Sequence, residues 1–255
     1  MSSLYWCEFP EECDWKKLGR WLDSDTITIY VTSSSRKEFD DWVKRIHKYA
    51  PTVKLGVWPT LSKEEGYWFS SFTSKKSIDV LEEFRGLDMK IDIEPPIPQK
   101  SYSLMTAFSW LVLNYFKGGE NKKYLQDKIL SLSKDAKVIV SGFPLPKFIL
   151  KRWGWISGKN IKHNYMLYTS FFPKILRGVY RWKYKFFIKM NKDAYYAVGL
   201  IGVGIFRNEP CYDKIEEMKK DIEFLKKNNV KNFVIFRIGS ILERGKEWLN
   251  ETISL

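Results

Sequence analysis

The sequence contains few of the residues on which metal and disulfide chemistry depend. Its three cysteines, Cys7, Cys13 and Cys211, are odd in number and lack the spacing of metal ligands. They predict no disulfide framework and favour a reducing compartment. Of the two histidines, His47 falls in a predicted helix and His163 just before a predicted strand. A metal site built from two or three histidines is therefore excluded, and we expect no metal.

Motifs for cofactor binding and for an activated nucleophile are lacking as well. The chain has no G-x-S-x-G, and no Ser/His/Asp order can be recognised in it. The glycine-rich run GLIGVGIF at residues 199–206 does not open a predicted helix, as a dinucleotide-binding fingerprint must. Its glycines, Gly199, Gly202 and Gly204, are interpreted as close backbone packing in a strand. No cofactor is predicted.

The sequence also lacks targeting and membrane-spanning segments. Its first residues, with early glutamates, do not follow the basic, apolar and small-residue order of a signal peptide. No uncharged apolar run reaches the ~18–20 residues that cross a bilayer. The nearest run, residues 101–116, is predicted to be a buried helix. We therefore expect a cytoplasmic protein. The scarcity of glutamine beside abundant Lys and Glu is typical of thermophiles.

What is present is a repeating pattern of strand-like runs in a chain of 255 residues, 44% of them hydrophobic. Most of the runs are continuously apolar, as expected for strands covered on both faces. Eight runs at about one per 32 residues match the length of a βα repeat, and a minimal eight-unit barrel has roughly 250 residues. We predict an α/β fold, a single (β/α)8 TIM barrel over residues 1–255; a doubly wound open sheet is the main alternative. The predicted strands are residues 4–9, 26–32, 53–58, 89–94, 136–141, 164–169, 195–205 and 230–238.

Helices are predicted in several of the connections. Residues 35–49 begin with a serine cap and carry an apolar face, and residues 213–228 repeat that pattern. The longest connection, residues 95–135, is predicted to hold two helices separated at Gly118 and Gly119.

In a βα barrel, ligands meet residues at the carboxyl ends of the strands and in the loops that follow. In LDMKIDIEPPIP, Asp92 and Glu94 are two residues apart in a strand, so both point into the barrel. Two carboxylates so close repel, which raises the pKa of one of them. A carboxyl group that stays protonated near neutral pH is what glycosidic cleavage needs as a general acid. The alternative is that these acids form ion pairs with Lys90 or Arg237.

These residues resemble the chitinase-like family 18 glycoside hydrolases, whose fourth strand ends in alternating acids that close with Asp-x-Glu. The resemblance implies that Glu94 protonates the leaving oxygen and that Asp92 orients a substrate acetamido group, which acts as the nucleophile. The sixth strand of that family carries Met-x-Tyr-Asp. Here Met166-Leu167-Tyr168 is present with Thr169 in place of the aspartate, and Lys90 replaces an acid of the fourth strand.

Other strand ends supply further candidates. Glu8, at the end of the first run, is a second or alternative catalytic carboxyl group, or else a surface acid in an acidic cluster. Trp58, Trp68 and Tyr168 are predicted to bind the apolar faces of sugar rings, although aromatic residues at such spacings also suit an ordinary core. Arg237, at the end of the eighth run, is predicted to bind substrate. The same positions include Ser33 to Ser35, Ser141 and Arg207.

The net charge of +13 is concentrated in one stretch. Residues 136–192 hold thirteen Lys and Arg and no Asp or Glu, while the rest of the chain is neutral. If FPKILRGVYRWKYKFFIKM forms a helix, one face carries an apolar stripe and basic residues lie beside and opposite it. Four of these basic residues, Arg177, Arg181, Lys185 and Lys189, are predicted to bind an anionic membrane surface or another anion. The stripe consists of Ile175, Val179, Trp182, Phe186 and Met190.

Two alternatives compete for this basic stretch. In one it is the ordinary sixth barrel helix, packed through its stripe; in the other it binds single-stranded nucleic acid, which no motif supports. The function we expect is a glycoside hydrolase acting on a glycan or glycoconjugate, cytoplasmic and peripheral to the inner membrane face. The alternative is a non-catalytic barrel that binds glycan or membrane.

Overall fold

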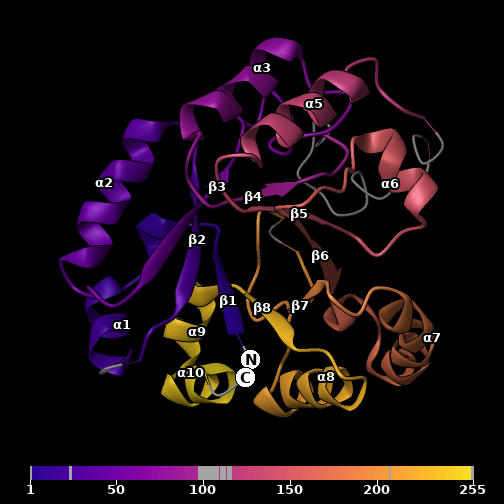
Figure 1. Ribbon diagram of the computed structural model, residues 1–255. Coiled ribbons are helices and arrows are strands. Elements are labelled where there is room, and N and C mark those ends of the chain that lie inside the picture. The colour runs from indigo at the N-terminus through magenta and orange to yellow at the C-terminus, as the bar shows by residue number, and fades with distance from the viewer. Residues whose placement is uncertain are drawn as a thin grey trace.

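Eight parallel strands form a closed barrel in the computed structural model of the chain (Figure 1). The structure describes residues 2–22, 25–96, 109, 113, 117–206 and 208–253. Each strand pairs with the next along the chain, and β1 pairs with β8, so the predicted barrel is confirmed and the open sheet is excluded. The strands are β1 (Ser2–Cys7), β2 (Thr28–Ser33), β3 (Lys54–Pro59), β4 (Met89–Asp92), β5 (Val138–Gly142), β6 (Ile161–Leu167), β7 (Tyr195–Val198) and β8 (Asn232–Phe236).

The strands are apolar on both faces because each face meets a different buried layer. Side chains such as Trp6, Tyr30 and Ile139 fill the interior of the barrel. Their neighbours, such as Tyr5, Ile29 and Val140, pack outward against the helices. Every strand therefore needs apolar residues at consecutive positions, which is the pattern seen in the sequence.

Helices surround the barrel and cover the outer face of the strands (Figure 1). Within the described ranges, no helix is long and apolar enough to cross a membrane. The helices are α1 (Trp15–Leu22), α2 (Arg36–His47), α3 (Lys75–Asp79), α5 (Lys122–Leu132), α6 (Lys147–Trp153), α7 (Arg177–Met190), α8 (Ile215–Lys227), α9 (Ile238–Arg244) and α10 (Lys246–Ile253).

The predicted helices at residues 35–49 and 213–228 are α2 and α8, each slightly shorter than expected. Ser35 caps α2 by accepting a hydrogen bond from the backbone N–H of Glu38 at 3.3 Å. In the long fourth connection the described helix is α5, which follows Gly119, where a Cβ would lie 2.0 Å from the Ser71 carbonyl oxygen. The run at residues 101–116 lies outside the described residues, apart from positions 109 and 113.

The predicted seventh strand is too long. Strand β7 ends at Val198, and residues 199–206 form a loop in place of the expected strand. The glycines do allow close packing, because a Cβ on Gly202 would lie 2.0 Å from Ser240 Oγ. This packing joins the loop to α9, so most of the apolar run is buried without entering the sheet, and Val203 is exposed.

Helix α7 follows β6, so the basic stretch forms the sixth helix of the barrel, which was one of the alternatives. That alternative also expected the helix to pack through the predicted apolar stripe, and this part is wrong. Tyr180, Tyr184, Phe187 and Ile188 contact the core. The predicted stripe of Ile175, Val179, Trp182, Phe186 and Met190 is exposed to solvent.

Two of the four basic residues predicted to bind anions are engaged inside the molecule. Arg177 is buried and donates to Glu217 at 2.9 Å, and Arg181 donates to the buried Asp221 at 2.6 Å. Lys185 and Lys189 are exposed.

Candidate active site

The carboxyl end of β4 brings three ionisable side chains into the mouth of the barrel. Lys90, Asp92 and Glu94 alternate along the strand and are all buried. Ile91 and Ile93 point the other way, into the layer between strands and helices, as predicted. The alternation of the strand therefore places one cation and two carboxyl groups on the inner side.

The loop after β3 holds the end of β4 in place. Phe69 forms a parallel bridge with Ile93: its N–H donates to the Asp92 carbonyl at 3.2 Å, and its carbonyl accepts from the Glu94 N–H at 3.1 Å. This loop, residues 60–69, carries Tyr67, Trp68 and Phe69. Its backbone positions Glu94 beyond the last residue of the strand.

Lys90 is the cation at the centre of this group. Its Nζ donates to Asp92 Oδ2 at 2.6 Å and lies 3.1 Å from the centre of the Trp58 ring and 5.2 Å from that of Trp6. Burial lowers the pKa of Lys90 to about 8, although Asp92 favours its charged form. The expected alternative of an ion pair between Lys90 and Asp92 is therefore observed, and it sits between two aromatic rings that stabilise the cation.

Glu94 has the environment expected of a general acid. Burial raises its pKa well above the ordinary value, the nearby Asp92 raises it further, and Lys90 opposes them. Burial also raises the pKa of Asp92, against the opposing effect of Lys90. Lys90 Nζ lies 2.6 Å from Asp92 Oδ2. Of the two carboxyl groups, we therefore assign the negative charge to Asp92 and the proton to Glu94.

Glu8, at the end of β1, is buried on the same side of the barrel. Tyr67 donates a hydrogen bond to its Oε1 at 3.4 Å. Burial raises the pKa of Glu8 to about 8, with a further increase from Glu209 and a smaller one from Asp92. The cationic groups Lys90 and Arg237 act in the opposite direction. Glu8 is therefore a buried acid of the mouth, and the alternative of a surface acid is wrong.

Glu209 is a fourth carboxyl group of the site, and the sequence analysis missed it. It comes from the loop after β7, where its carboxylate accepts a hydrogen bond from the Gly204 N–H. A Cβ on Gly204 would lie 2.7 Å from Glu8 Oε2 and 2.8 Å from Glu209 Oε2, so these two oxygens cannot be farther apart than the sum of those distances. Burial raises the pKa of Glu209 to about 7.

The sequence could have indicated Glu209, because it is an acid that follows the seventh strand. The predicted strand at residues 195–205 was too long and obscured the start of the loop. Once residues 199–206 are a loop after β7, the residues that follow belong to the same face of the barrel as Glu94. An acid in such a loop is a candidate by the rule that selected Glu8.

Aromatic rings form the walls of the mouth. Phe236 lies 6.4 Å from Trp58 and 5.8 Å from Tyr168, measured between ring centres, and Phe143 is 6.5 Å from Tyr168. Burial raises the pKa of Tyr168 well above 10, and Asp92, Glu94, Glu8 and Glu209 all raise it further. The Tyr168 hydroxyl therefore keeps its proton and can donate a hydrogen bond, and it lies within electrostatic reach of all four acids.

Two loops from opposite sides of the barrel meet over the acids. Trp68, from the loop after β3, lies 6.0 Å from Phe206, from the loop after β7, and Tyr67 and Ile205 join the same apolar cluster. The predicted sugar-binding residue Trp68 is thus part of a cover over the mouth. This cover and the neighbouring rings keep Glu8, Asp92 and Glu94 buried.

The other predicted residues at strand ends have different surroundings. Arg237 is buried beside Phe9 and donates to Glu12 at 3.0 Å, while its charge lowers the pKa values of Glu8 and Glu209. Thr169, which stands in place of the family aspartate, donates to the buried Asp221 behind the barrel wall. Arg207 lies outside the described residues.

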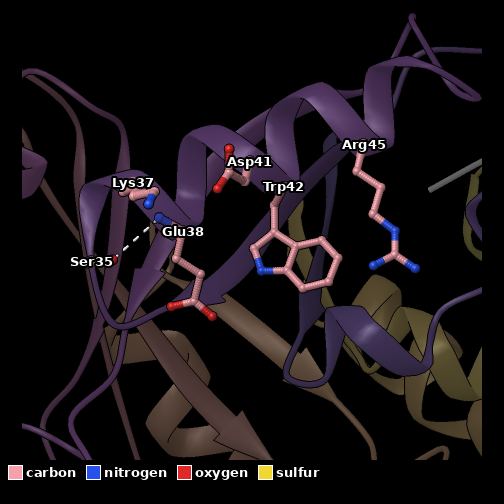
Figure 2. Close-up of a pocket in the computed structure, with 6 residues that line it drawn as sticks. All are labelled: Ser35, Lys37, Glu38, Asp41, Trp42 and Arg45. Atoms are coloured by element: carbon pink, nitrogen blue, oxygen red, sulfur yellow. Dashed lines mark hydrogen bonds between the residues drawn. The ribbon is translucent and has the colours of Figure 1, made fainter.

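A surface hollow elsewhere on the molecule does not coincide with these acids. Figure 2 shows it on the outer side of α2, where Trp42 lies among charged side chains that project from the helix. Its lining residues are Ser35, Lys37, Glu38, Asp41, Trp42 and Arg45. This hollow is open to solvent and contains none of the four acids at the barrel mouth, so the buried mouth remains the candidate active site.

The architecture defines a (β/α)8 barrel protein with an acidic mouth, and the comparison with solved structures concerns the barrel. The chain is similar to the glycoside hydrolase domain of PgaB (BpsB) from Bordetella bronchiseptica, with a TM-score of 0.61 and 10% sequence identity over 100% of this chain and 99% of that chain. It is also similar to a family 18 chitinase from Crocus vernus, with a TM-score of 0.46 and 9% identity over 100% and 98% of the two chains.

The similarity to the PgaB domain confirms the barrel fold, at low sequence identity. No protein-family model matches the chain, and no curated protein sequence does.

Proposed function

We propose that this barrel is a glycoside hydrolase acting on a glycan or glycoconjugate, with Glu94 as the general acid. One observation carries the proposal: Glu94 is buried at the carboxyl end of β4 beside Asp92, and its pKa is raised well above the ordinary value. A carboxylic acid held neutral at neutral pH has a proton available for a leaving oxygen.

The chemistry requires one proton donor and one group that helps water attack. The acid form of Glu94 gives its proton to the glycosidic oxygen as the bond from that oxygen to the anomeric carbon breaks. Water adds to the anomeric carbon and loses a proton to a carboxylate, so that one water is consumed for each bond cleaved. Glu209 can take this second part at neutral pH because its pKa is about 7, whereas Glu8, with a pKa of about 8, can do so only at higher pH.

Two contacts argue against simple transfer of the acetamido mechanism. Asp92 is engaged with Lys90, and Thr169 donates to Asp221 behind the barrel wall. We therefore assign Asp92 to charge stabilisation beside Glu94, as an anion held by Lys90 next to a developing oxocarbenium ion. Trp58, Trp68 and Tyr168 are assigned to substrate binding, since their rings lie at or over the mouth.

The similarity of the whole chain to the glycoside hydrolase domain of PgaB supports this assignment. That fold places catalytic groups at the carboxyl ends of its strands, as any βα barrel does. The raised pKa values at this end of the barrel are independent support, since perturbed carboxyl groups cluster at catalytic sites.

The test is cleavage of a broad panel of chromogenic glycosides and oligosaccharides by the wild type and by Glu94→Gln. Loss of general acid catalysis lowers the rate by at least ~10². Glu223→Gln, which changes an exposed glutamate on α8, is the matched control and retains full activity. Circular dichroism and thermal unfolding establish that each variant is folded.

The outcome distinguishes the carboxyl groups from one another. If Glu94→Gln keeps full activity while Glu8→Gln loses it, the acid is Glu8 and the assignment of Glu94 is wrong. Substrates with an activated leaving group need less protonation, so Glu94→Gln loses less activity on them than on natural glycosides.

The second candidate function is a non-catalytic barrel that binds glycan. It is favoured by the Lys90–Asp92 ion pair, which neutralises the aspartate beside the acid, and by the loops that cover the mouth. Its signature is oligosaccharide binding, measured by calorimetry, that Trp68→Ala weakens while no glycoside of the panel is cleaved.

A further inference from the structure

Helix α7 exposes a large apolar surface. The exposed fractions are 86% for Ile175, 73% for Trp182 and 68% for Phe186, and those of Val179 and Met190 exceed one half. Helical spacing places Val179, Trp182, Phe186 and Met190 on one face of α7, and Ile175 lies in the 3₁₀ turn that leads into the helix; these five residues are hereafter called the α7 stripe. Exposed side chains of this size that are grouped along one helix mark an interaction site on a soluble protein.

The orientation of the helix is fixed by its opposite face. Tyr180, Tyr184 and Ile188 pack against the barrel, and Arg177 and Arg181 form ion pairs with Glu217 and Asp221 of α8. Asp221 is fully buried and also accepts hydrogen bonds from Thr169 and Tyr212. Turning the α7 stripe inward would break this network, so the stripe faces solvent as a stable feature of the fold.

Three exposed lysines flank the stripe. Helical spacing places Lys183 on one side of it and Lys185 and Lys189 on the other. The ion pairs of this region involve Lys174, Arg177 and Arg181, and the three flanking lysines have no ion-pair partner among the described residues. The sequence from 136 to 192 contains no Asp or Glu, so no acid on α6, β6 or α7 offsets their charge.

We propose that the α7 stripe and its flanking lysines bind the surface of an anionic lipid bilayer. An apolar face rimmed by lysines lets Trp182 and Phe186 enter the boundary between headgroups and acyl chains while the ammonium groups contact anionic headgroups. The helix lies in the plane of the interface, with the barrel above it in water. This surface is separate from the acidic mouth, and its test does not depend on any glycosidase activity.

The chemistry of the face distinguishes lipid from other partners. A second copy of the chain would bring two sets of uncompensated lysines together, which costs energy at low salt. Proteins bind single-stranded nucleic acid by stacking its bases on aromatic side chains. Three of the five residues of the stripe, Ile175, Val179 and Met190, are not aromatic and offer only aliphatic surface. An anionic bilayer matches both parts of the face.

The location of α7 relates this surface to the barrel mouth. The helix follows β6, so its first residues and the preceding 3₁₀ turn, Lys174–Leu176, lie on the side where the strands end. In Figure 1 α7 lies at the periphery of the barrel, next to α8 and away from α2. Docking through the stripe would therefore hold the mouth beside the bilayer surface.

The experiment is flotation of the full chain with vesicles of phosphatidylglycerol and phosphatidylcholine in equal parts, and with phosphatidylcholine alone. Binding is expected to the anionic vesicles only, and to weaken strongly between about 20 mM and about 500 mM salt. Changing Lys183, Lys185 and Lys189 to Gln together weakens binding by about 10²-fold, since each lysine near an anionic bilayer contributes roughly five-fold. The same three changes to Arg retain binding.

Matched variants separate the surface from net charge. Changing Lys220, Lys226 and Lys227 of α8 to Gln removes the same charge from exposed positions elsewhere and leaves binding within about two-fold. The pair Trp182→Ser and Phe186→Ser keeps every lysine and lowers binding by more than about ten-fold.

Three results with vesicles and with the free chain would overturn the proposal, and a fourth would come from a nucleic-acid assay. The first three are equal binding to neutral vesicles, equal loss with the α8 variant, and sedimentation of the free chain as a dimer that the Trp182 and Phe186 changes dissociate. The third result assigns the stripe to a second copy. Binding of single-stranded oligonucleotides that excludes vesicles assigns it to nucleic acid instead.

Discussion

Replacing Glu8 by Gln should stabilise the protein, and more so as the pH rises. Burial and Glu209 raise the pKa of Glu8 to about 8 in the folded state, whereas an exposed glutamate titrates near ~4.3. Between these values the folded chain keeps a proton that the unfolded chain has released. The stability contributed at low pH is therefore lost as the pH rises through this window, by about 1.4 kcal/mol for each pH unit.

The size of the effect follows from the width of the window. From pH 5 to pH 8 the wild type loses up to about 4 kcal/mol through this one group, and Glu8→Gln does not. For a chain of this size 1 kcal/mol corresponds to about 2–4 °C, so the two melting temperatures should diverge by on the order of 10 °C. The amide oxygen of glutamine still accepts the hydrogen bond that Tyr67 donates to Oε1.

The assay is thermal and urea unfolding of both proteins at pH 5, 6, 7 and 8. Glu223→Gln serves as the control for loss of an exposed carboxylate and should show no divergence with pH. A difference between Glu8→Gln and the wild type that stays constant over this range would refute the reasoning. So would a variant that is less stable than the wild type at pH 8.

Two further predictions concern ion pairs. Lys90→Met leaves Asp92 buried without its cation and should cost about 3–5 kcal/mol in urea unfolding, while the double change with Asp92→Leu should cost less than Lys90→Met alone. Arg181→Gln removes a partner of the buried Asp221 and should destabilise the fold by about 1–3 kcal/mol, whereas Lys185→Gln on the same helix should change stability by less than about 0.5 kcal/mol. Equal effects of Arg181→Gln and Lys185→Gln would contradict the inward orientation of Arg181.

The barrel could be predicted because its strands need apolar residues on both faces. Eight such runs were visible, and each overlaps an observed strand. The seventh predicted run was longer than strand β7. An apolar run indicates that residues are buried, but it does not show that they pair with a neighbouring strand. Ile201 and Ile205 are buried in a loop, where the glycines allow the backbone to pack against α9.

The acids on strands could be placed from the sequence, and the acid on a loop could not. Asp92 and Glu94 follow from the alternation of β4, and Glu8 follows from the end of β1. Glu209 is brought to Glu8 by the course of a loop, which depends on contacts between segments about two hundred residues apart. Local patterns do not contain that information.

Helix α7 shows why an apolar stripe alone does not predict which face of a helix is buried. Its other face, with Tyr180, Tyr184 and Ile188, is apolar too, so hydrophobic burial alone could have favoured either orientation. The choice is made by Asp221, which enters the core only if arginine and hydroxyl donors meet it there. Arg181 therefore turns inward and carries α7 with it. The basic residues left outside are lysines, whose compact charges stay hydrated at the surface.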